Sequence, residues 1–191
     1  MLTRYEMAKL ANRIGVKRGY FLTRDKGELA YKLLKHELLN TTEGMALVLL
    51  FPPAQLVDSS FADESAVRLG EEIIKGKYGN RCLILEGLTS DSIKNFEAVI
   101  SLRGIKLPLL VIKVNGDYGV IGKLEDSLQE TLDFVHQHHV LTASDLVVQL
   151  GLAVNTASTR LKRLHDLHLV RRKYEISERG LQYIYHRWDD H

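Results

Sequence analysis

The second part of the sequence gathers side chains that could bind the phosphates and base edges of duplex DNA. Six of the eight lysine and arginine residues after position 123 fall between Arg160 and Lys173. Small polar side chains, which can hydrogen-bond to base edges, stand just before them. The candidate DNA-binding residues are Asn155, Thr156, Thr159, Arg160, Lys162, Arg163, Arg171, Arg172 and Lys173. Because these charges are clustered, they say more about a nucleic-acid partner than the net charge of +2 does.

Two helices are expected to position these side chains. Thr142 begins a capping-box pattern, which predicts a helix over 143–150 that ends at Gly151. Asn155 would cap a second helix over 155–167. Apolar residues at helical spacing would turn inward on this second helix, namely Ala157, Leu161 and Leu164. The side chains expected to point outward are Asn155, Thr159, Lys162 and Asp166, flanked by Thr156 and Arg163.

The segment that follows predicts a short β-hairpin, or wing. Only six residues, VRRKYE, separate Leu169 from Ile176, and a final helix is expected over 178–188. A turn at Arg172-Lys173 lacks the glycine or asparagine that two-residue hairpins favour. We therefore expect phosphate contacts from these cations but no contact of the wing tip with the minor groove.

The stretch TASDLVVQLGLAVNTASTRLKRLHDLHLVRR resembles the winged helix-turn-helix of bacterial transcription regulators of the MarR/ArsR type. In that family TA-x-x-L begins one helix and N-x-A-S-x-R-L-x-x-L forms the recognition helix. The run ISERG resembles the strand exit that leads into the last helix. The resemblance covers residues 141–180 and implies a homodimer that binds double-stranded DNA. The alternative is a winged helix that makes only protein contacts.

The first part of the sequence alternates apolar runs with helical patterns, which predicts an α/β layer with a mostly parallel sheet. The run ALVLLF at 46–51 is apolar throughout, which is typical of a strand buried on both faces. Strands are expected at 20–22, 46–51, 81–86, 107–114 and 118–121. Helices are expected at 3–14, 23–39, 61–75, 90–102 and, beyond this part, 124–139.

The stretches FLTRDKGELAYKLLKHEL and VDSSFADESAVRLGEEI resemble parts of a bacterial STAS-like domain family of undefined function. The resemblance covers residues 17–122. The residues that carry it are Phe21, Thr23, Arg24 and the run Ser60-Phe61-Ala62-Asp63-Glu64. STAS domains are protein-interaction modules, best known as anti-sigma factor antagonists. The resemblance therefore implies that this part of the chain senses a signal or binds a protein partner.

The same resemblance makes Ser60, with Ser59 beside it, a candidate phosphoacceptor. Some STAS domains are controlled by phosphorylation of a serine at the start of the first helix after the buried strand. A phosphate there would meet free backbone N–H groups, but it would also meet the carboxylates of Asp58, Asp63 and Glu64. The alternative is that Ser60 only caps the helix.

The expected organisation is an N-terminal helix over 1–16, a STAS-like α/β domain over 17–122 and a winged helix-turn-helix domain, dominated by helices, over 123–191. No apolar run is long enough to span a membrane, and the N-terminus is too polar for a secretory signal. The single cysteine, Cys82, fits a reducing cytoplasm. We therefore expect a cytoplasmic protein of bacterial type with no membrane partner.

Neither a catalytic site nor a cofactor is predicted. The chain has none of the common phosphate-loop, nucleophile-elbow or zinc-protease motifs. Its clustered histidines lie near expected helix ends, which the helix dipole already favours, so no metal site is predicted. We therefore expect a DNA-binding transcription regulator rather than an enzyme. The alternative is a protein-interaction adaptor of the anti-sigma antagonist type, in which the winged helix serves dimerisation or docking.

Overall fold

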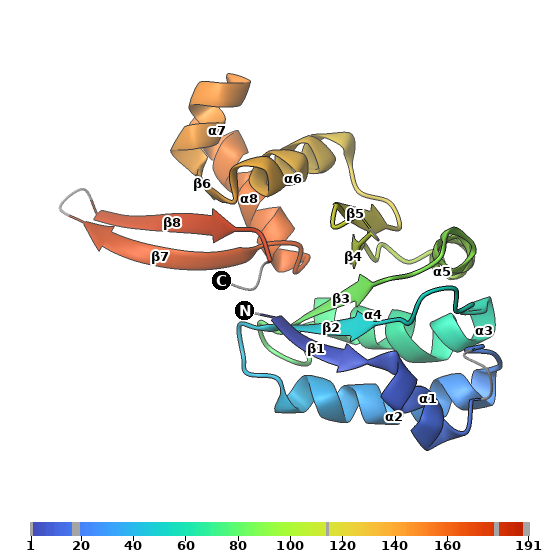
Figure 1. The fold of residues 1–191 in the computed structure, drawn as a ribbon. Helices are drawn as coiled ribbons and strands as arrows, with labels where there is room; N and C mark the ends of the chain where they lie inside the picture. The colour runs from blue at the N-terminus through green and yellow to red at the C-terminus, as the bar shows by residue number, and fades with distance from the viewer. Residues whose placement is uncertain (1, 17–19, 114, 178–179, 189–191) are drawn as a thin grey trace. The chain divides into compact units, whose positions relative to one another are not determined.

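The computed structural model describes residues 2–16, 20–113, 115–177 and 180–188 (Figure 1). The chain divides into two compact units, Met1–Lys123 and Leu124–His191. It is a mixed α/β protein, as the alternation of strands and helices predicted. Within the described ranges, no helix is both long enough and apolar enough to cross a membrane.

A five-stranded sheet forms the frame of the first unit. Its strands are β1 (Leu2–Glu6), β2 (Ala46–Leu50), β3 (Cys82–Glu86), β4 (Leu109–Ile112) and β5 (Tyr118–Ile121). They lie side by side in chain order; β1 to β4 are parallel, and β5 returns antiparallel to β4. This confirms the mostly parallel sheet. Apart from their last residues, β2 and β3 are buried on both faces, as their continuous apolar runs predicted.

The helices of the first unit pack a core against this sheet. They are α1 (Met7–Ile14), α2 (Arg24–Asn40), α3 (Ser59–Ala62), α4 (Arg68–Ile74) and α5 (Ser90–Leu102). One π-helical turn, η1 (Asp63–Val67), joins α3 to α4 without a break. The core joins helix residues such as Leu34 and Phe96 to alternate strand residues such as Leu47 and Leu85. The helices therefore lie on one face of the sheet (Figure 1).

Two predictions near the N-terminus are wrong. The helix expected over 3–14 begins only at Met7, because the residues before it pair in parallel with β2 as an edge strand. The segment expected as a separate helix over 1–16 therefore contributes a strand to the sheet and α1 to the core of the first unit. The strand expected at 20–22 is reduced to one bridge between Phe21 and the segment before α3.

The second unit combines helices with a three-stranded antiparallel sheet. Its elements are α6 (Asp126–His138), β6 (Val140–Thr142), α7 (Ala143–Leu150), α8 (Val154–Asp166), β7 (Arg171–Ser177) and β8 (Gly180–His186). The sheet order is β6-β8-β7, so β8 lies between the short β6 and its hairpin partner β7. The helices expected over 124–139, 143–150 and 155–167 are confirmed to within two residues.

The prediction of a final helix over 178–188 is wrong. Its described part contains β8, which pairs with β7 along its whole length. Leu181, Tyr183 and Tyr185 recur at every second position, and this period of two belongs to a strand rather than to a helix. More residues of the second unit lie in helices than in strands, as the sequence indicated, but a strand of a three-stranded sheet replaces the expected last helix.

The prediction of a short wing is wrong because the same strand, β8, lengthens the hairpin. Arg172 and Lys173 lie within β7 rather than at a turn, because the pairing with β8 continues out to Ser177 and Gly180. Each strand of the hairpin has seven residues. At the rise of a β-strand this corresponds to a wing of about 20 Å, several times the reach expected from the six-residue segment.

Gly87, which follows β3, should tolerate no side chain. Its φ is +82°, and a Cβ at this position would lie 2.5 Å from the carbonyl oxygen of Phe51. Gly44 has nearly the same φ, +79°, but its Cβ would meet nothing within 4 Å. We expect Gly44→Ala to lower the free energy of unfolding by about 1–2 kcal/mol and Gly87→Ala by about 1–3 kcal/mol more. Urea denaturation measures both losses, and equal losses would contradict the close contact.

Candidate nucleic-acid interface

The helix-turn-helix of the second unit begins with the capping box that the sequence predicted. The Oγ1 of Thr142 accepts the backbone N–H of Asp145 at 3.3 Å, and the Asp145 carboxylate accepts the N–H of Thr142 at 2.7 Å. α7 ends at Gly151, whose left-handed conformation (φ +63°) redirects the chain towards α8. Local side-chain chemistry thus fixes the start of α7 and the turn that follows it.

α8 has one buried apolar face and one exposed polar face. Its fully buried residues, as predicted, are Ala157, Leu161 and Leu164. The helix begins at Val154, with Ala153 as its N-cap residue, so the expected capping role of Asn155 is wrong and its side chain is exposed instead. The exposed residues of α8 are Val154, Asn155, Thr156, Ser158, Thr159, Lys162, Arg163 and Asp166. Sequence reasoning missed Ser158, although its place among the outward polar residues signals it.

Two arginines of α8 are bound to carboxylates from α6 and its N-cap residue. Arg163 donates through both terminal nitrogens to Glu125, at 2.6 and 2.8 Å, and this hydrogen bonding raises the pKa of Arg163. Arg160 donates to Glu130 at 2.9 Å. Only 19% of the Arg160 side chain is exposed, so this residue joins α8 to α6 rather than facing solvent with the other candidate DNA contacts.

Lys162 also has a carboxylate partner, because Asp166 lies one turn further along α8 at 2.5 Å. Every cation of α8 is therefore matched by an acid. Such surface ion pairs contribute only about 0–1 kcal/mol each, so the phosphate of a nucleic acid could replace the carboxylate. The partners on α6 lie at least 30 positions away along the chain, and sequence spacing gave no signal for them.

The three cations of the wing lie at the end of β7 nearest to α8. The guanidinium of Arg172 is 4.5 Å from the ring centroid of Tyr183, and that of Arg171 is 5.8 Å from the ring centroid of Trp188. Lys173 is exposed. Contact with an aromatic face holds an arginine in place but does not neutralise its charge. The charges of Arg172 and Lys173 are therefore better placed to meet phosphate than those of α8.

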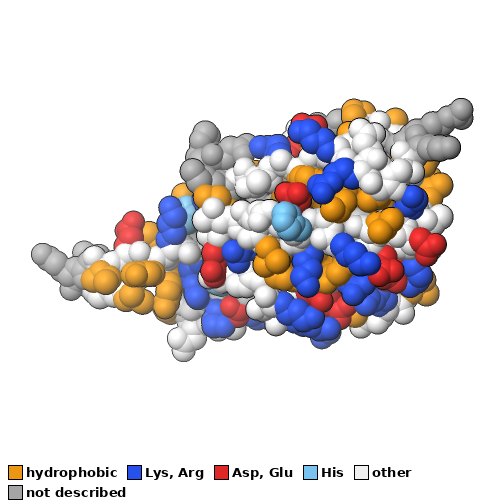
Figure 2. Space-filling model, turned by 90° about the horizontal axis from the view of Figure 1, so that it is seen from below, with side chains coloured by type: hydrophobic (Ala, Val, Ile, Leu, Met, Phe, Trp, Pro, Cys, Tyr) orange, Lys and Arg blue, Asp and Glu red, His pale blue; other side chains and the backbone are white. Residues whose placement is uncertain are grey.

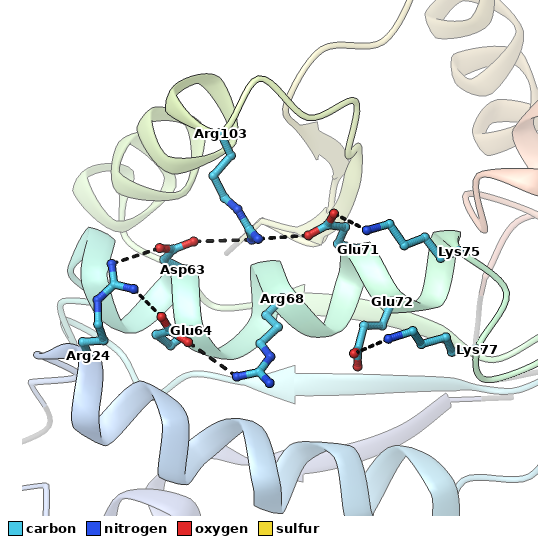
Figure 3. A network of polar contacts seen from close by, with 9 residues as sticks. All are labelled: Arg24, Asp63, Glu64, Arg68, Glu71, Glu72, Lys75, Lys77 and Arg103. Carbon is cyan, nitrogen blue, oxygen red and sulfur yellow. Dashed lines mark hydrogen bonds and ion pairs between the residues drawn. The ribbon is translucent and has the colours of Figure 1, made fainter.

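In the first unit, the two motifs that carry the STAS-like resemblance meet. Arg24, at the start of α2, donates to the carboxylates of Asp63 and Glu64 in η1 (Figure 3). Arg103 binds the other oxygen of Asp63 at 3.4 Å, and Arg68 binds the other oxygen of Glu64 at 3.5 Å. The acids of the S-F-A-D-E run therefore tie α2, α4 and α5 together through a network of alternating charges.

The backbone around this network is tightly constrained. Thr23 has φ +73°, which is rare for a β-branched residue, and its N–H donates to the Asp58 carboxylate at 3.1 Å. A Cβ on Gly27 would lie 2.9 Å from the carbonyl oxygen of Phe61, so α2 approaches α3 closely because residue 27 is glycine. Strained residues and π-helical turns are frequent at functional sites. This α2–η1 junction is therefore the candidate partner site of the first unit.

Asp58, not Ser60, caps the helix that contains the candidate phosphoacceptors. Its Oδ1 accepts the N–H of Phe61 at 2.7 Å, and the helix begins at Ser59. Ser59 and Ser60 therefore both lie in the first helical turn, where the Oγ of Ser59 is 3.5 Å from Oδ1 of Asn95. The interpretation of Ser60 as a helix cap is wrong. Its role as a phosphoacceptor stays a prediction.

Comparisons with models of protein families, with curated proteins and with solved structures found no match to this chain. Both resemblances therefore rest on the residues and motifs named above. What they imply about activity and partners applies to this chain as a proposal.

A carboxylate on α4 collects three hydrogen-bond donors. Glu72 accepts from the hydroxyls of Tyr31 and Tyr78, at 2.7 and 2.6 Å, and from the ammonium of Lys77 at 2.7 Å. Burial alone would raise the pKa of Glu72, but these hydrogen bonds outweigh burial and hold its pKa at about 2. Glu72 therefore stays charged near neutral pH, joins α2 to α4 and is not suited to acid–base catalysis.

Among the described residues, no three side chains of histidine, cysteine, aspartate or glutamate come close enough to hold a metal ion. Cys82 is buried in β3, and burial raises the pKa of its thiol. On α6, burial and then the charges of Arg187 and His139 lower the pKa of His136 to about 4.

Protonation of His136 should destabilise the second unit under acidic conditions. The pKa of His136 in the folded protein, about 4, lies below its ordinary value of 6.5. The neutral imidazole therefore contributes its full share to the free energy of unfolding above pH 6.5, and this share is lost as the pH falls towards 4. His136→Gln should reduce this loss, and His138→Gln, exposed on the same helix, should not. Burial also lowers the pKa of His165, so part of the pH dependence should persist. Thermal melts between pH 7 and pH 4 measure this loss of stability. If the melting temperature of His136→Gln depended on pH as steeply as that of the unaltered chain, His136 would not be its source.

Proposed function

We propose that this protein is a DNA-binding transcription regulator in which α8 reads duplex DNA. The exposed polar face of α8 carries the proposal. Asn155, Thr156 and Thr159 are exposed near the start of a helix whose opposite face is fixed in a core. Amide and hydroxyl groups at this end of a recognition helix can bond to base edges in the major groove. Lys162 and Arg163, further along the helix, are suited to phosphate contacts.

The order of elements in the second unit supports the proposal. α6, β6, α7, α8 and the β7–β8 hairpin follow one another as in the winged helix-turn-helix that the sequence resembles, and β6 pairs with β8 as the third strand. The hairpin is much longer than the six-residue segment suggested. Contact of the wing with the minor groove, which the sequence argued against, is therefore part of the proposal.

The ion pairs of α8 determine how DNA would bind. Phosphates must replace the carboxylates of Glu125 and Asp166, and the chain after position 123 carries ten acidic residues against eight basic ones. We therefore expect weak binding to unrelated sequences and only a shallow dependence on salt concentration, because few cations are available to neutralise phosphates. Hydrogen bonds to bases would contribute a large share of the affinity for the preferred sequence.

Lys162→Ala should weaken duplex binding, whereas Lys32→Ala should not. The two lysines are matched, because each pairs with an acid four positions away and has 63% or 64% of its side chain exposed. Lys32 lies on α2 of the first unit. We expect Lys162→Ala to reduce affinity by about tenfold and to lower the salt slope by about one. Fluorescence anisotropy with mixed genomic duplexes at two salt concentrations measures both. Identical behaviour of the two variants would contradict the assigned face.

Glu125→Gln should strengthen duplex binding. The substitution keeps the shape of the side chain but removes the negative charge that competes with phosphate for Arg163. We expect the dissociation constant to fall by about threefold to tenfold, and the same change at Glu28, the partner of Lys32, to have no effect. Parallel titrations of the two variants measure the difference. Weaker or unchanged binding by Glu125→Gln would count against phosphate contact by Arg163.

A protein-interaction adaptor of the anti-sigma antagonist type is the second candidate function. The complete pairing of the α8 cations with carboxylates favours it, because a nearly neutral helix face attracts DNA less than an uncompensated one. In this function the second unit would serve docking or dimerisation. Absence of any duplex binding by the unaltered chain at low salt would favour the adaptor.

For the first unit we propose partner binding or signal sensing at the α2–η1 junction. The support is the meeting of Arg24 with Asp63 and Glu64, which brings together the two motifs of the STAS-like resemblance. Ser60 lies in the first turn of α3, next to this network in the chain, and is the candidate phosphoacceptor.

A further inference from the structure

The β7–β8 hairpin carries a stripe of exposed apolar side chains. Tyr174 is paired with Tyr183, and Ile176 is paired with Leu181, so all four lie on the same face of the hairpin. Their exposed fractions are 63%, 44%, 78% and 55%, respectively. Tyr185, on the same face but nearer to α8, is buried. Figure 2 shows hydrophobic side chains gathered on the hairpin. Exposed apolar patches of this kind are typical of interaction surfaces.

β7 is also an edge strand. The sheet order is β6-β8-β7, and no strand among the described residues pairs with the outer edge of β7. Its sequence, RRKYEIS, has neither a proline nor a glycine to discourage pairing. A seven-residue edge with exposed apolar side chains presents unpaired N–H and C=O groups to another strand. The most direct partner for such an edge is a strand added in the same sheet.

We propose that β7 pairs antiparallel with β7 of a second copy of the chain, about a two-fold axis at Tyr174. In this register Tyr174 lies opposite its own counterpart, and Lys173 of each copy lies opposite Glu175 of the other. The symmetry therefore produces two pairs of opposite charge. The pairing joins the two three-stranded sheets into one six-stranded sheet, in which the apolar side chains of both hairpins share a face.

The charge pattern selects this register over its neighbours. Residues directly opposite each other share a face, so the axis can only shift by whole residues. An axis at Lys173 would place the two Lys173 side chains opposite each other, and an axis at Glu175 would do the same for the two glutamates. Like charges directly opposite each other destabilise a sheet. Within the charged part of β7, the axis at Tyr174 thus avoids both repulsions and also gains two attractions.

A charge exchange in the full chain tests the register, without DNA and therefore independently of the proposed function. Lys173→Glu and Glu175→Lys each place like charges opposite one another twice per dimer. We expect each to raise the dimer dissociation constant by about tenfold or more, and the double variant to restore it to within about threefold of the unaltered chain. Sedimentation velocity measures all four proteins, with circular dichroism to confirm folding. A monomeric unaltered chain, unaffected single variants or an unrestored double variant would each overturn the proposal.

Disulfide trapping tests the same axis independently of affinity. In the proposed register the two copies of residue 174 face each other with Cα atoms about 4.5–5.5 Å apart, a distance that a disulfide can bridge. The copies of residue 175 would be about 8 Å apart and could not be bridged. Tyr174→Cys should therefore form a linked dimer under a mild added oxidant, and Glu175→Cys should not; Cys82 is buried and stays unreactive. Equal trapping of the two variants, or none at position 174, would overturn the proposed axis.

Discussion

Arg163 donates hydrogen bonds from both terminal nitrogens to Glu125. Ion pairs of Arg160 and Lys162 with acids balance the remaining positive charge of α8. This balance governs the second unit, because it joins α8 to α6 and leaves the helix nearly neutral towards solvent. The cations best placed to meet an anion are Arg172 and Lys173 on β7. A partner of α8 would therefore be chosen by hydrogen bonds to small polar side chains more than by long-range attraction, which slows encounter but favours discrimination.

The first unit uses its charges in a related way. Asp63, Glu64 and Glu72 are partly shielded from solvent, and each joins one helix to another through its contacts with Arg24 or Tyr31. Gly27 allows the close approach of α2 that these contacts require. Such a layer is rigid when all its partners are in place. The loss of any one partner, or a new charge at Ser60 next to them in the chain, would change the contacts of several helices at once.

Local chemistry made much of the fold predictable. The capping box at Thr142, the turn at Gly151 and the buried strand at 46–51 each depend on neighbouring residues, and all three are present. β8 was missed although the alternation of Leu181, Tyr183 and Tyr185 signals a strand, whereas β1 was missed because its strand character depends on pairing with β2, far away in the chain. The carboxylates that bind the α8 arginines were missed for the same reason, since only the tertiary fold brings α6 to α8.

The strand order of the first unit has a consequence for how the chain acquires its structure. Each strand pairs only with the strands before and after it in the sequence, so each pairing can form as soon as the next strand is available. No strand has to be inserted between two strands that are already paired, although each parallel pairing closes a long loop, as between Leu2 and Ala46. The sheet can therefore grow one strand at a time as the chain leaves the ribosome, with each new helix covering the same face before the next strand arrives.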